Sequence, residues 1–156
     1  MRLTDILTAD RVFVADPARS ISSKREAIEQ LSTLLATGTG KESSAICKLL
    51  SDREELQSTG IGDGVAIPHG SLDVLDGQTA AMLLCPGGVD FDSIDGRLAR
   101  IVIGVVGPKR ATGEHLRMLA RISRLLRDGA FRDRLLSSPD SAAAFSVLRA
   151  EEDSRS

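Results

Sequence analysis

The residues best suited to chemistry lie in one stretch, Ser58 to Gly70, with the sequence STGIGDGVAIPHG. Alternating glycines in its first half can adopt positive φ angles or let the backbone approach a ligand closely. The apolar run 65–67 then predicts a buried strand, which Pro68 ends because its ring fixes φ and keeps the preceding residue extended. His69 follows directly. The pattern therefore places a titratable imidazole at a strand end beside a loop of bare amide donors, a setting for a nucleophile and an anion.

Two common phosphate-binding motifs do not fit this stretch. No Gly-Lys-Ser/Thr follows the glycines, so the loop is not a Walker loop. The glycines precede a strand instead of a helix, and Val65 stands where a dinucleotide fingerprint requires its third glycine. From residue types alone, a simple turn followed by a surface or capping histidine is the favoured interpretation.

The stretch resembles the active-site signature of the enzyme IIA family of the bacterial phosphoenolpyruvate-dependent phosphotransferase system. The matching branch is the fructose/mannitol type, which includes the nitrogen-regulatory members, and thirteen contiguous residues fit its pattern. In that family the histidine of Ile-Pro-His accepts a phosphoryl group, so the resemblance implies that His69 is the acceptor. It also implies a phosphate-binding loop whose amides and hydroxyls hold the group, formed by Ser58, Thr59, Gly60, Gly62 and Gly64.

A cation precedes this loop. Arg53 lies at the end of an expected helix, five residues before Ser58. A solvated side chain that complements the helix C-terminus would explain it. The family commonly carries an arginine at this place, so the resemblance implies a guanidinium that stabilises the phosphoryl group.

The second histidine of the chain opens a leucine-rich helix, for which Thr112 is the expected N-cap. At 100° per residue, His115 shares a face with apolar residues only, and geometry alone predicts a buried core histidine. Glu114-His115-Leu116 is similar to the family's second histidine segment, so the resemblance implies that His115 stabilises the phosphoryl group. The opposite face is expected to be solvated and carries Arg117, Arg121, Arg124 and Arg127.

Composition limits the function classes. A chain of 156 residues is long enough for one domain with a sizeable core. With no Trp or Tyr, the core must be aliphatic and stacking of nucleic-acid bases is not expected. The net charge of −2 offers no footprint for nucleic acid or membrane.

Cysteine usage and the chain start bear on compartment and cofactors. Cys47 and Cys85 are isolated from metal or redox spacings and are expected to be buried and reduced. No signal peptide or membrane span is recognised, which predicts a cytosolic protein. We expect no metal, no cofactor and no membrane insertion.

Alternating elements predict the fold. Expected strands span residues 11–15, 65–67, 79–85, 89–91 and 100–106, and expected helices span residues 23–38, 44–55, 113–126, 130–136 and 140–148. A capping box at Ser23 opens the first helix and Gly38 ends it. The unbroken β-branched run 100–106 predicts a central strand covered on both faces.

These elements predict an α/β fold: a single three-layer domain in which a small mixed β-sheet is flanked by helices on both faces, with the site at one sheet end. The domain would span residues 1–150, and residues 151–156 would form a frayed C-terminal tail. The resemblance runs from about residue 3 to 148, and Lys24-Arg25-Glu26-Ala27-Ile28 looks like the nitrogen-regulatory type.

The function that the resemblance implies is a metal-independent phosphocarrier. Its donor would be an HPr-like histidine phosphocarrier protein, and its output would be regulation through the binding of target proteins. One alternative is a sugar-import subunit that passes phosphate to a IIB partner. Another is a non-catalytic, anion-sensing interaction module. The sequence leaves open the donor, the targets, the oligomeric state and the ring nitrogen of His69 that reacts.

Overall fold

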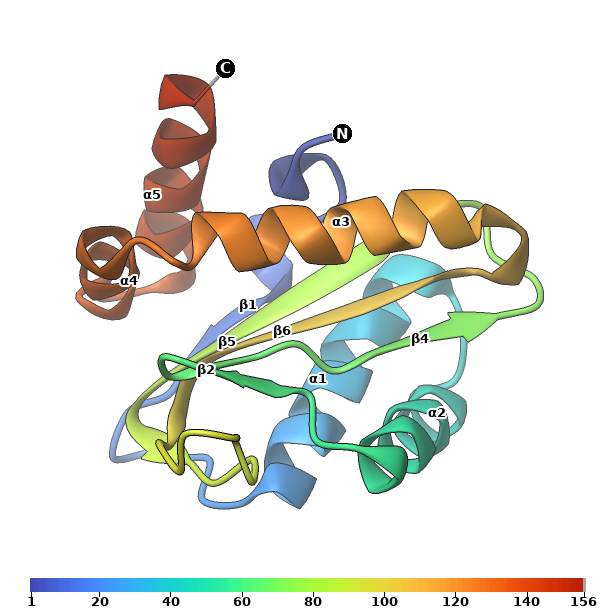
Figure 1. Cartoon of the computed structure of the whole chain (residues 1–156), viewed down its shortest axis with the longest axis horizontal. Coiled ribbons are helices and arrows are strands. Elements are labelled where there is room, and N and C mark those ends of the chain that lie inside the picture. Colours follow the sequence, from blue (N-terminus) through green and yellow to red (C-terminus); the bar gives the residue numbers. More distant parts are fainter. Residues whose placement is uncertain (156) are drawn as a thin grey trace.

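The computed structural model describes residues 1–155 and has three layers, with helices on both faces of one mixed sheet (Figure 1). Its strands are β1 (Val12–Val14), β2 (Gly60–Gly62), β3 (Val65–Ala66), β4 (His69–Leu72), β5 (Thr79–Val89) and β6 (Ala99–Pro108). Its helices are α1 (Lys24–Thr39), α2 (Ser43–Leu56), α3 (Thr112–Leu125), α4 (Gly129–Leu136) and α5 (Ser141–Ser154), with short 3-10 turns at Leu3–Asp5, Ala9–Arg11 and Lys109–Ala111. The predicted fold class is confirmed.

Strand β6 is the centre of the sheet, as its β-branched run predicted. The strand order is β1-β5-β6-β3-β2, and β4 also pairs with β6. Strands β5 and β6 are antiparallel, whereas β3 and β4 run parallel to β6 along its successive halves. Pro68 therefore does not end the strand but interrupts it, and its carbonyl still accepts from Val105 N (3.0 Å). His69 is the first residue of the resumed strand.

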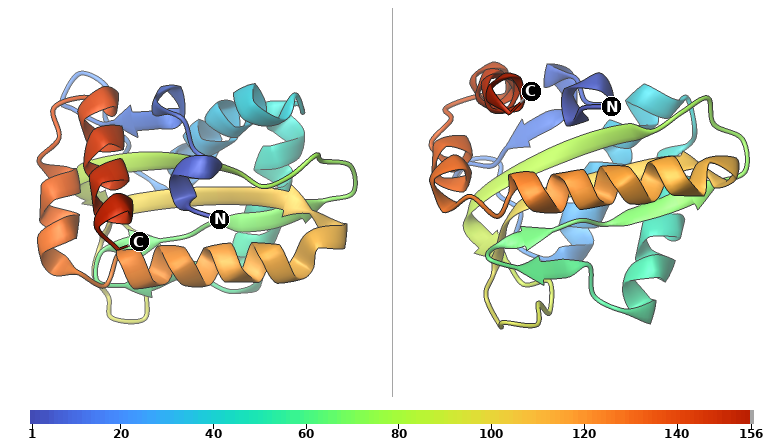
Figure 2. Two further views of the ribbon diagram at one scale, coloured as in Figure 1. Left: turned by 90° about the horizontal axis from the view of Figure 1, so that it is seen from above. Right: turned by 45° about the horizontal axis from the view of Figure 1, so that its top comes forward.

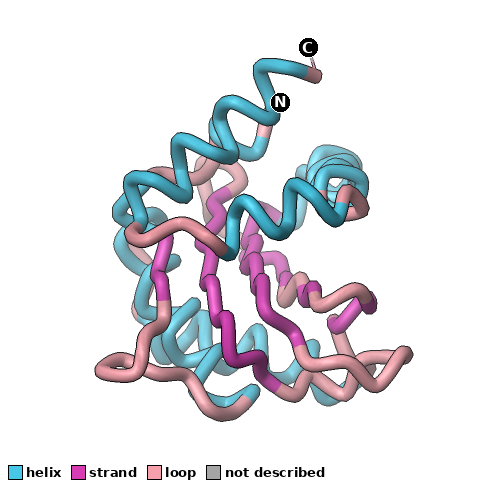
Figure 3. The backbone as a smooth tube through the Cα atoms, turned by 90° about the vertical axis from the view of Figure 1, so that its left-hand side faces the viewer, coloured by secondary structure: helices cyan, strands magenta, loops and turns pink. Residues whose placement is uncertain are grey.

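The two faces of β6 carry separate cores. Ile101, Ile103 and Val105 pack under α3, α4 and α5. Val102 and Val106 face α1 and α2 on the other side. This alternation follows from the two-residue period of a strand. Figure 2 and Figure 3 show the sheet between these helical layers.

The first helix begins as predicted but ends later. Ser23 caps it by accepting from Glu26 N (3.1 Å), while the Glu26 carboxylate accepts from Ser22 N (3.0 Å) and not from the capping residue. Gly38 does not end the helix, because Gly40 takes the left-handed conformation at φ 72°. Gly38 instead leaves room for the Thr79 side chain, which a Cβ there would meet at 2.7 Å.

Two other element ends differ from the prediction. Strand β5 does not end before 86–88 but continues to Val89, and a register shift after Leu84 absorbs the Pro-Gly-Gly segment. Thr112 does not cap α3 but lies in its first turn, because a 3-10 turn precedes it. In the strand, the pairing of Val89 with Ala99 decides an end that local propensity left open.

The prediction of a frayed tail over residues 151–156 is wrong for residues 151–154, whereas Ser156 lies outside the described residues. Helix α5 continues to Ser154, and Glu152 is fully buried. The Glu152 carboxylate accepts from Leu3 N and Thr4 N, both at 2.9 Å, and from Arg121 Nε at 2.8 Å. The arginine face of α3 was expected to be solvated, but Arg121 on that face is paired with Glu152. The two chain ends lie side by side at this contact (Figure 2).

Both cysteines are free thiols, but only Cys85 is buried, and Cys47 is half-buried. Burial raises the pKa of Cys85 to about 11, so this thiol stays protonated at neutral pH. Across residues 1–155, no helix has the length and apolar character needed to cross a membrane.

Candidate functional site

The sheet register places His69 under α3. His69 pairs with Val105, whose side chain belongs to the core beneath α3. The His69 Nδ1 atom lies 2.7 Å from the carbonyl oxygen of Ile67. Because a carbonyl only accepts, Nδ1 carries the proton and donates it. The other nitrogen, Nε2, is then left with a free lone pair.

The surroundings of His69 keep its ring neutral. Burial lowers the pKa of His69, although the hydrogen bond to Ile67 opposes this effect. The Arg53 charge lowers the pKa further, and the Glu54 charge raises it. Since the balance lies below the ordinary value of 6.5, the neutral, nucleophilic form dominates at neutral pH.

His115 is both buried and adjacent to His69. It lies in the first turn of α3, is 6% exposed, and its ring centroid is 5.8 Å from that of His69. Burial and the neighbouring His69 both lower the pKa of His115. The two interpretations from sequence, a core histidine and a partner of the acceptor, thus describe the same position.

Gln78 is one of two site residues that sequence reasoning missed, and Glu54 is the other. Its amide oxygen lies 2.8 Å from His115 Nδ1, and this contact is buried. No local pattern marks Gln78, which is separated from His115 by 37 residues along the chain. Only the pairing of β5 with β6, which brings the start of β5 under α3, could have identified it.

Arg53 and Glu54 lie in the last turn of α2, where their charges act on His69. Arg53 Nη1 donates to Gln57 O at 2.8 Å, which holds the cation at the helix end. Glu54, which the sequence analysis left out, is 7% exposed and accepts from Thr59 N (2.9 Å), from the Thr59 hydroxyl and from Lys24 Nζ (3.1 Å). This buried carboxylate therefore fixes the segment between α2 and β2.

The expectation of bare amide donors is wrong for the first part of the glycine loop. The Thr59 amide is already bonded to Glu54, and the Gly60 amide donates to Ser58 Oγ at 3.0 Å. Ser58 in turn donates its hydroxyl to Phe91 O. Thr59 O also accepts from Ile67 N (3.0 Å), so this segment supports the chain two residues before His69, and a direct role in holding a phosphoryl group stays a prediction.

The remaining glycines form the tip of the β2–β3 hairpin. Gly62 and Gly64 have φ angles of 92° and 78°, and Asp63 between them also has a positive φ of 57°. His69 follows Gly64 by five positions, which in extended chain corresponds to about 16 Å. The tip is thus placed well along the sheet from the histidine pair.

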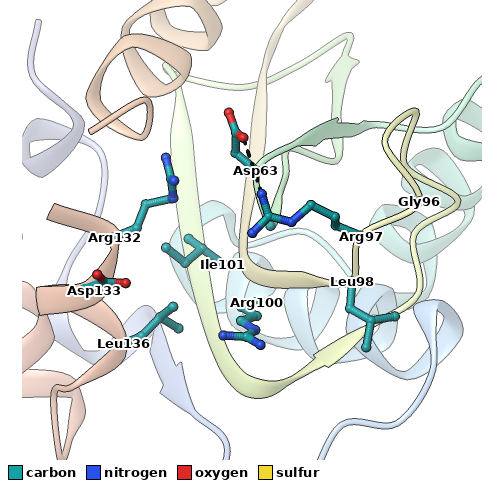
Figure 4. A pocket seen from close by; sticks show the side chains of 10 residues that line it. Asp63, Gly96, Arg97, Leu98, Arg100, Ile101, Arg132, Asp133 and Leu136 are labelled. Carbon is teal, nitrogen blue, oxygen red and sulfur yellow. Dashed lines mark ion pairs between the residues drawn. The ribbon is translucent and has the colours of Figure 1, made fainter. Parts of the chain in front are cut away.

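The hairpin tip lines a different cavity, of about 420 Å³, against the 96–101 segment and α4 (Figure 4). Two of its three arginines are engaged within the protein: Arg97 lies 3.7 Å from Asp63, and Arg132 Nη1 donates to the carbonyl of Leu126 at 2.6 Å. Neither histidine lines this cavity. Gly62 and Gly64 therefore build a turn there, away from His69, and their part in holding a phosphoryl group stays a prediction.

In residues 1–155, no group of three or more His, Cys, Asp or Glu side chains is arranged to hold a metal ion. The histidine pair has the Nε2 atoms of its two rings, with Arg53 nearby and the buried amide of Gln78 on His115. This set suits a covalent phosphoryl acceptor with hydrogen-bond donors around it.

Comparison with known proteins gives the family. Residues 5–151 match the model of the family described as phosphoenolpyruvate-dependent sugar phosphotransferase system, EIIA 2. The chain belongs to this family. As an EIIA domain, it is 36% identical over 148 residues to the nitrogen regulatory protein of Bradyrhizobium diazoefficiens, covering 95% of each chain.

Other EIIA proteins extend the similarity. The crystal structure of nitrogen regulatory protein IIA-Ntr from Neisseria meningitidis superposes with a TM-score of 0.83 at 28% identity, covering 92% of this chain and 97% of that one. The mannitol-specific enzyme IIA component of Staphylococcus aureus is 32% identical over 126 residues, covering 78% of this chain and 79% of that protein. Both nitrogen-regulatory and sugar-specific relatives are thus found.

Proposed function

We propose that this EIIA accepts a phosphoryl group on Nε2 of His69 from an HPr-like histidine phosphocarrier protein, without a metal ion and in the cytosol. The observation that carries the proposal is the hydrogen bond from His69 Nδ1 to Ile67 O (2.7 Å), which leaves the lone pair on Nε2. The lowered pKa of His69 supports it, because only a neutral ring can attack phosphorus.

The transfer balances as a displacement at phosphorus. The Nε2 lone pair forms the new N–P bond, the P–N bond of the donor breaks, and its electron pair returns to the donor's ring. The proton on Nδ1 stays in place, held by Ile67 O. Since the transition state is loose, the protein contributes mainly positioning and charge, with Arg53 and His115 supplying donors around the phosphoryl oxygens.

The phosphorylated site would carry roughly two negative charges. We propose that this change of charge alters which target protein binds, so that the output is regulatory. Higher identity to a nitrogen regulatory protein (36%) than to a mannitol-specific component (32%) supports this choice. The alternatives are transfer to a IIB partner of a sugar system, and an anion-sensing module without transfer.

The test is phosphorylation of the purified protein by phosphoenolpyruvate, enzyme I and an HPr-like phosphocarrier. We expect acid-labile, base-stable phosphate on wild type and none on His69→Ala. His115→Ala is the control, because it removes the other histidine and should still accept phosphate, more slowly. Equal uptake by His69→Ala and wild type would overturn the assignment, and no uptake by wild type would favour the anion-sensing module.

The output is tested separately. Phosphorylated and unphosphorylated protein are each used to capture partners, and the phosphorylated form is also mixed with a fructose- or mannitol-type IIB domain. Partners that depend on the phosphorylation state, with no transfer to IIB, support regulation. Rapid phosphoryl transfer to IIB would contradict the regulatory output and support the sugar-import alternative.

A further inference from the structure

The Gln78 amide has an unbalanced set of hydrogen bonds. Its oxygen accepts from His115 Nδ1, whereas its nitrogen is buried and is the only buried side-chain N or O atom in residues 1–155 without a partner. Leaving a buried donor unpaired costs about 1–3 kcal/mol. Such a group in a folded protein calls for an explanation, and a place in the reaction is one of them.

The sheet holds Gln78 in this position by its register. Thr79 pairs with Val106, so the antiparallel ladder sets Gln78 opposite Gly107. A Cβ at Gly107 would lie 2.5 Å from the amide carbon of Gln78. The amide therefore lies over a bare stretch of backbone, and the absence of a side chain there is what admits it beneath α3.

The orientation of this amide decides where His115 carries its proton. With the oxygen on Nδ1, a neutral His115 must hold its proton on Nδ1, and Nε2 is only an acceptor. Turning the amide by 180° exchanges its oxygen and nitrogen at almost unchanged shape. The amide nitrogen then donates to Nδ1, so the neutral ring releases its proton from Nδ1 and takes one up on Nε2.

The two orientations suit two stages of the reaction. Before transfer, a proton on His115 Nε2 has no anion to bind. After transfer, phosphoryl oxygens lie on His69, whose ring centroid is 5.8 Å from that of His115, and a lone pair directed at them would be repelled. Because burial disfavours a charged ring, a neutral His115 can donate to the phosphoryl group only from the Nε2–H tautomer.

We propose that Gln78 is a positioning residue that sets the tautomer of His115, with its amide oxygen on Nδ1 in the free protein and its amide nitrogen on Nδ1 once His69 is phosphorylated. The proposal rests on the proposed function. A rotating amide has a specific advantage here, since the ring gains an Nε2–H donor while it releases its Nδ1 proton, with no net uptake of a proton from solvent.

The first experiment is ¹⁵N NMR of the two imidazole rings in the free protein and after phosphorylation of His69 by the carrier system. Protonated and unprotonated ring nitrogens have well-separated ¹⁵N shifts, so each tautomer is read directly. We expect His115 to be Nδ1–H in the free protein and Nε2–H, still neutral, in the phosphoprotein. Nδ1–H in both states, or a doubly protonated ring in the phosphoprotein, would overturn the proposal.

Variants separate the tautomer effect from packing. Gln78→Glu has almost the same shape but can only accept, so His115 should keep its Nδ1 proton in both states; a neutral Nε2–H form in this variant would overturn the proposal. Gln78→Leu should slow phosphoryl transfer about tenfold per folded molecule. Its control is Gln30→Leu, on α1 across the sheet from α3, which should leave the rate unchanged.

The outcomes also distinguish this proposal from the proposed function. If wild type takes no phosphate, the phosphocarrier function fails, and the His115 tautomer in the free protein is still measured. If wild type is phosphorylated on His69 but the His115 tautomer does not change, only the role of Gln78 fails. Equal transfer rates for Gln78→Leu and Gln30→Leu would also exclude it.

Discussion

The Nδ1 atoms of the two histidines have different kinds of hydrogen-bond partner. His69 Nδ1 faces a backbone carbonyl, which can only accept and is fixed by the chain. His115 Nδ1 faces a side-chain amide, which can either accept or donate. The reacting ring thus has one fixed tautomer, as a nucleophile requires, whereas its neighbour has two within reach.

Arg53 should contribute to rate more than to folding, since its only hydrogen bond from the guanidinium in residues 1–155 goes to the carbonyl of Gln57. Loss of one charge-assisted contact to the phosphoryl group corresponds to about 2 kcal/mol, or roughly thirtyfold in transfer rate. We expect this loss in Arg53→Ala. Lys48→Ala removes a more exposed cation of the same helix and is the control. A transfer rate within twofold of wild type would mean that Arg53 is only a solvated cation at the helix end.

Proton linkage gives a pH prediction. Burial lowers the pKa of both His69 and His115, so below pH 6.5 the unfolded chain binds protons that the folded protein resists. The stabilisation is complete above about pH 6.5 and is lost as the pH falls through the lowered folded-state values. Urea unfolding at about pH 7.5 and about pH 5.5 measures it. His115→Gln should show a smaller loss on acidification than wild type, and an unchanged loss would contradict the prediction.

At the scale of elements, a buried carboxylate joins the end of α2 to the residue that precedes β2. Glu54 accepts from both the amide and the hydroxyl of Thr59 and from Lys24 on α1. Arg53 is the adjacent residue, so the same clamp orients its backbone. The glycine loop is therefore held by Glu54 and does not need a bound anion to take its shape.

Glu54→Gln should lower the free energy of unfolding by about 1–3 kcal/mol, because it removes a buried acceptor and the charge facing Lys24. Transfer should also slow, since the segment before His69 loses its anchor. Glu55→Gln, at an exposed neighbour, should change stability by about 0.5 kcal/mol at most. Urea denaturation and transfer rates on the same samples measure both effects. Equal behaviour of the two variants would mean that Glu54 anchors nothing.

The sequence predicted the elements well where local pattern controls them. The run 100–106 identified the central strand, and Ser23 identified the start of α1, because burial on two faces and capping are written in adjacent residues. The ends of α1 and β5 were wrong because packing of Gly38 on Thr79 and the pairing of Val89 with Ala99 decide them. Gln78 could not be found, since its partner is set by strand register.

Glu54 and Glu152 left a signal that sequence reasoning did not use. Each continues a buried stripe at a spacing of four residues, after Ile46 and Leu50 in α2 and after Ala144 and Leu148 in α5. A carboxylate on the apolar face of a helix is buried only when donors satisfy it. In both helices that position predicts a tertiary anchor.

At the scale of the whole molecule, Glu152 joins three segments that are far apart in the chain. It connects the end of α5 to the N-terminal turn through Leu3 and Thr4, and to α3 through Arg121. The core under α3 also contains side chains from both chain ends, among them Leu3 and Leu148. The layer that covers the histidine pair is thus closed by a contact remote from the pair itself.

Glu152→Ala should therefore destabilise the fold without changing the chemistry. Removing one partner of a buried, hydrogen-bonded ion pair costs about 3–5 kcal/mol, which lowers the melting temperature by roughly 10 °C in a domain of this size. Asp153→Ala, which removes an exposed carboxylate paired with Arg2, should cost at most about 1 kcal/mol. Thermal melts compare the two variants, and transfer rates per folded molecule should equal that of wild type in both. A transfer rate that falls in Glu152→Ala while the protein is fully folded would show that the chain ends also position α3 over His69.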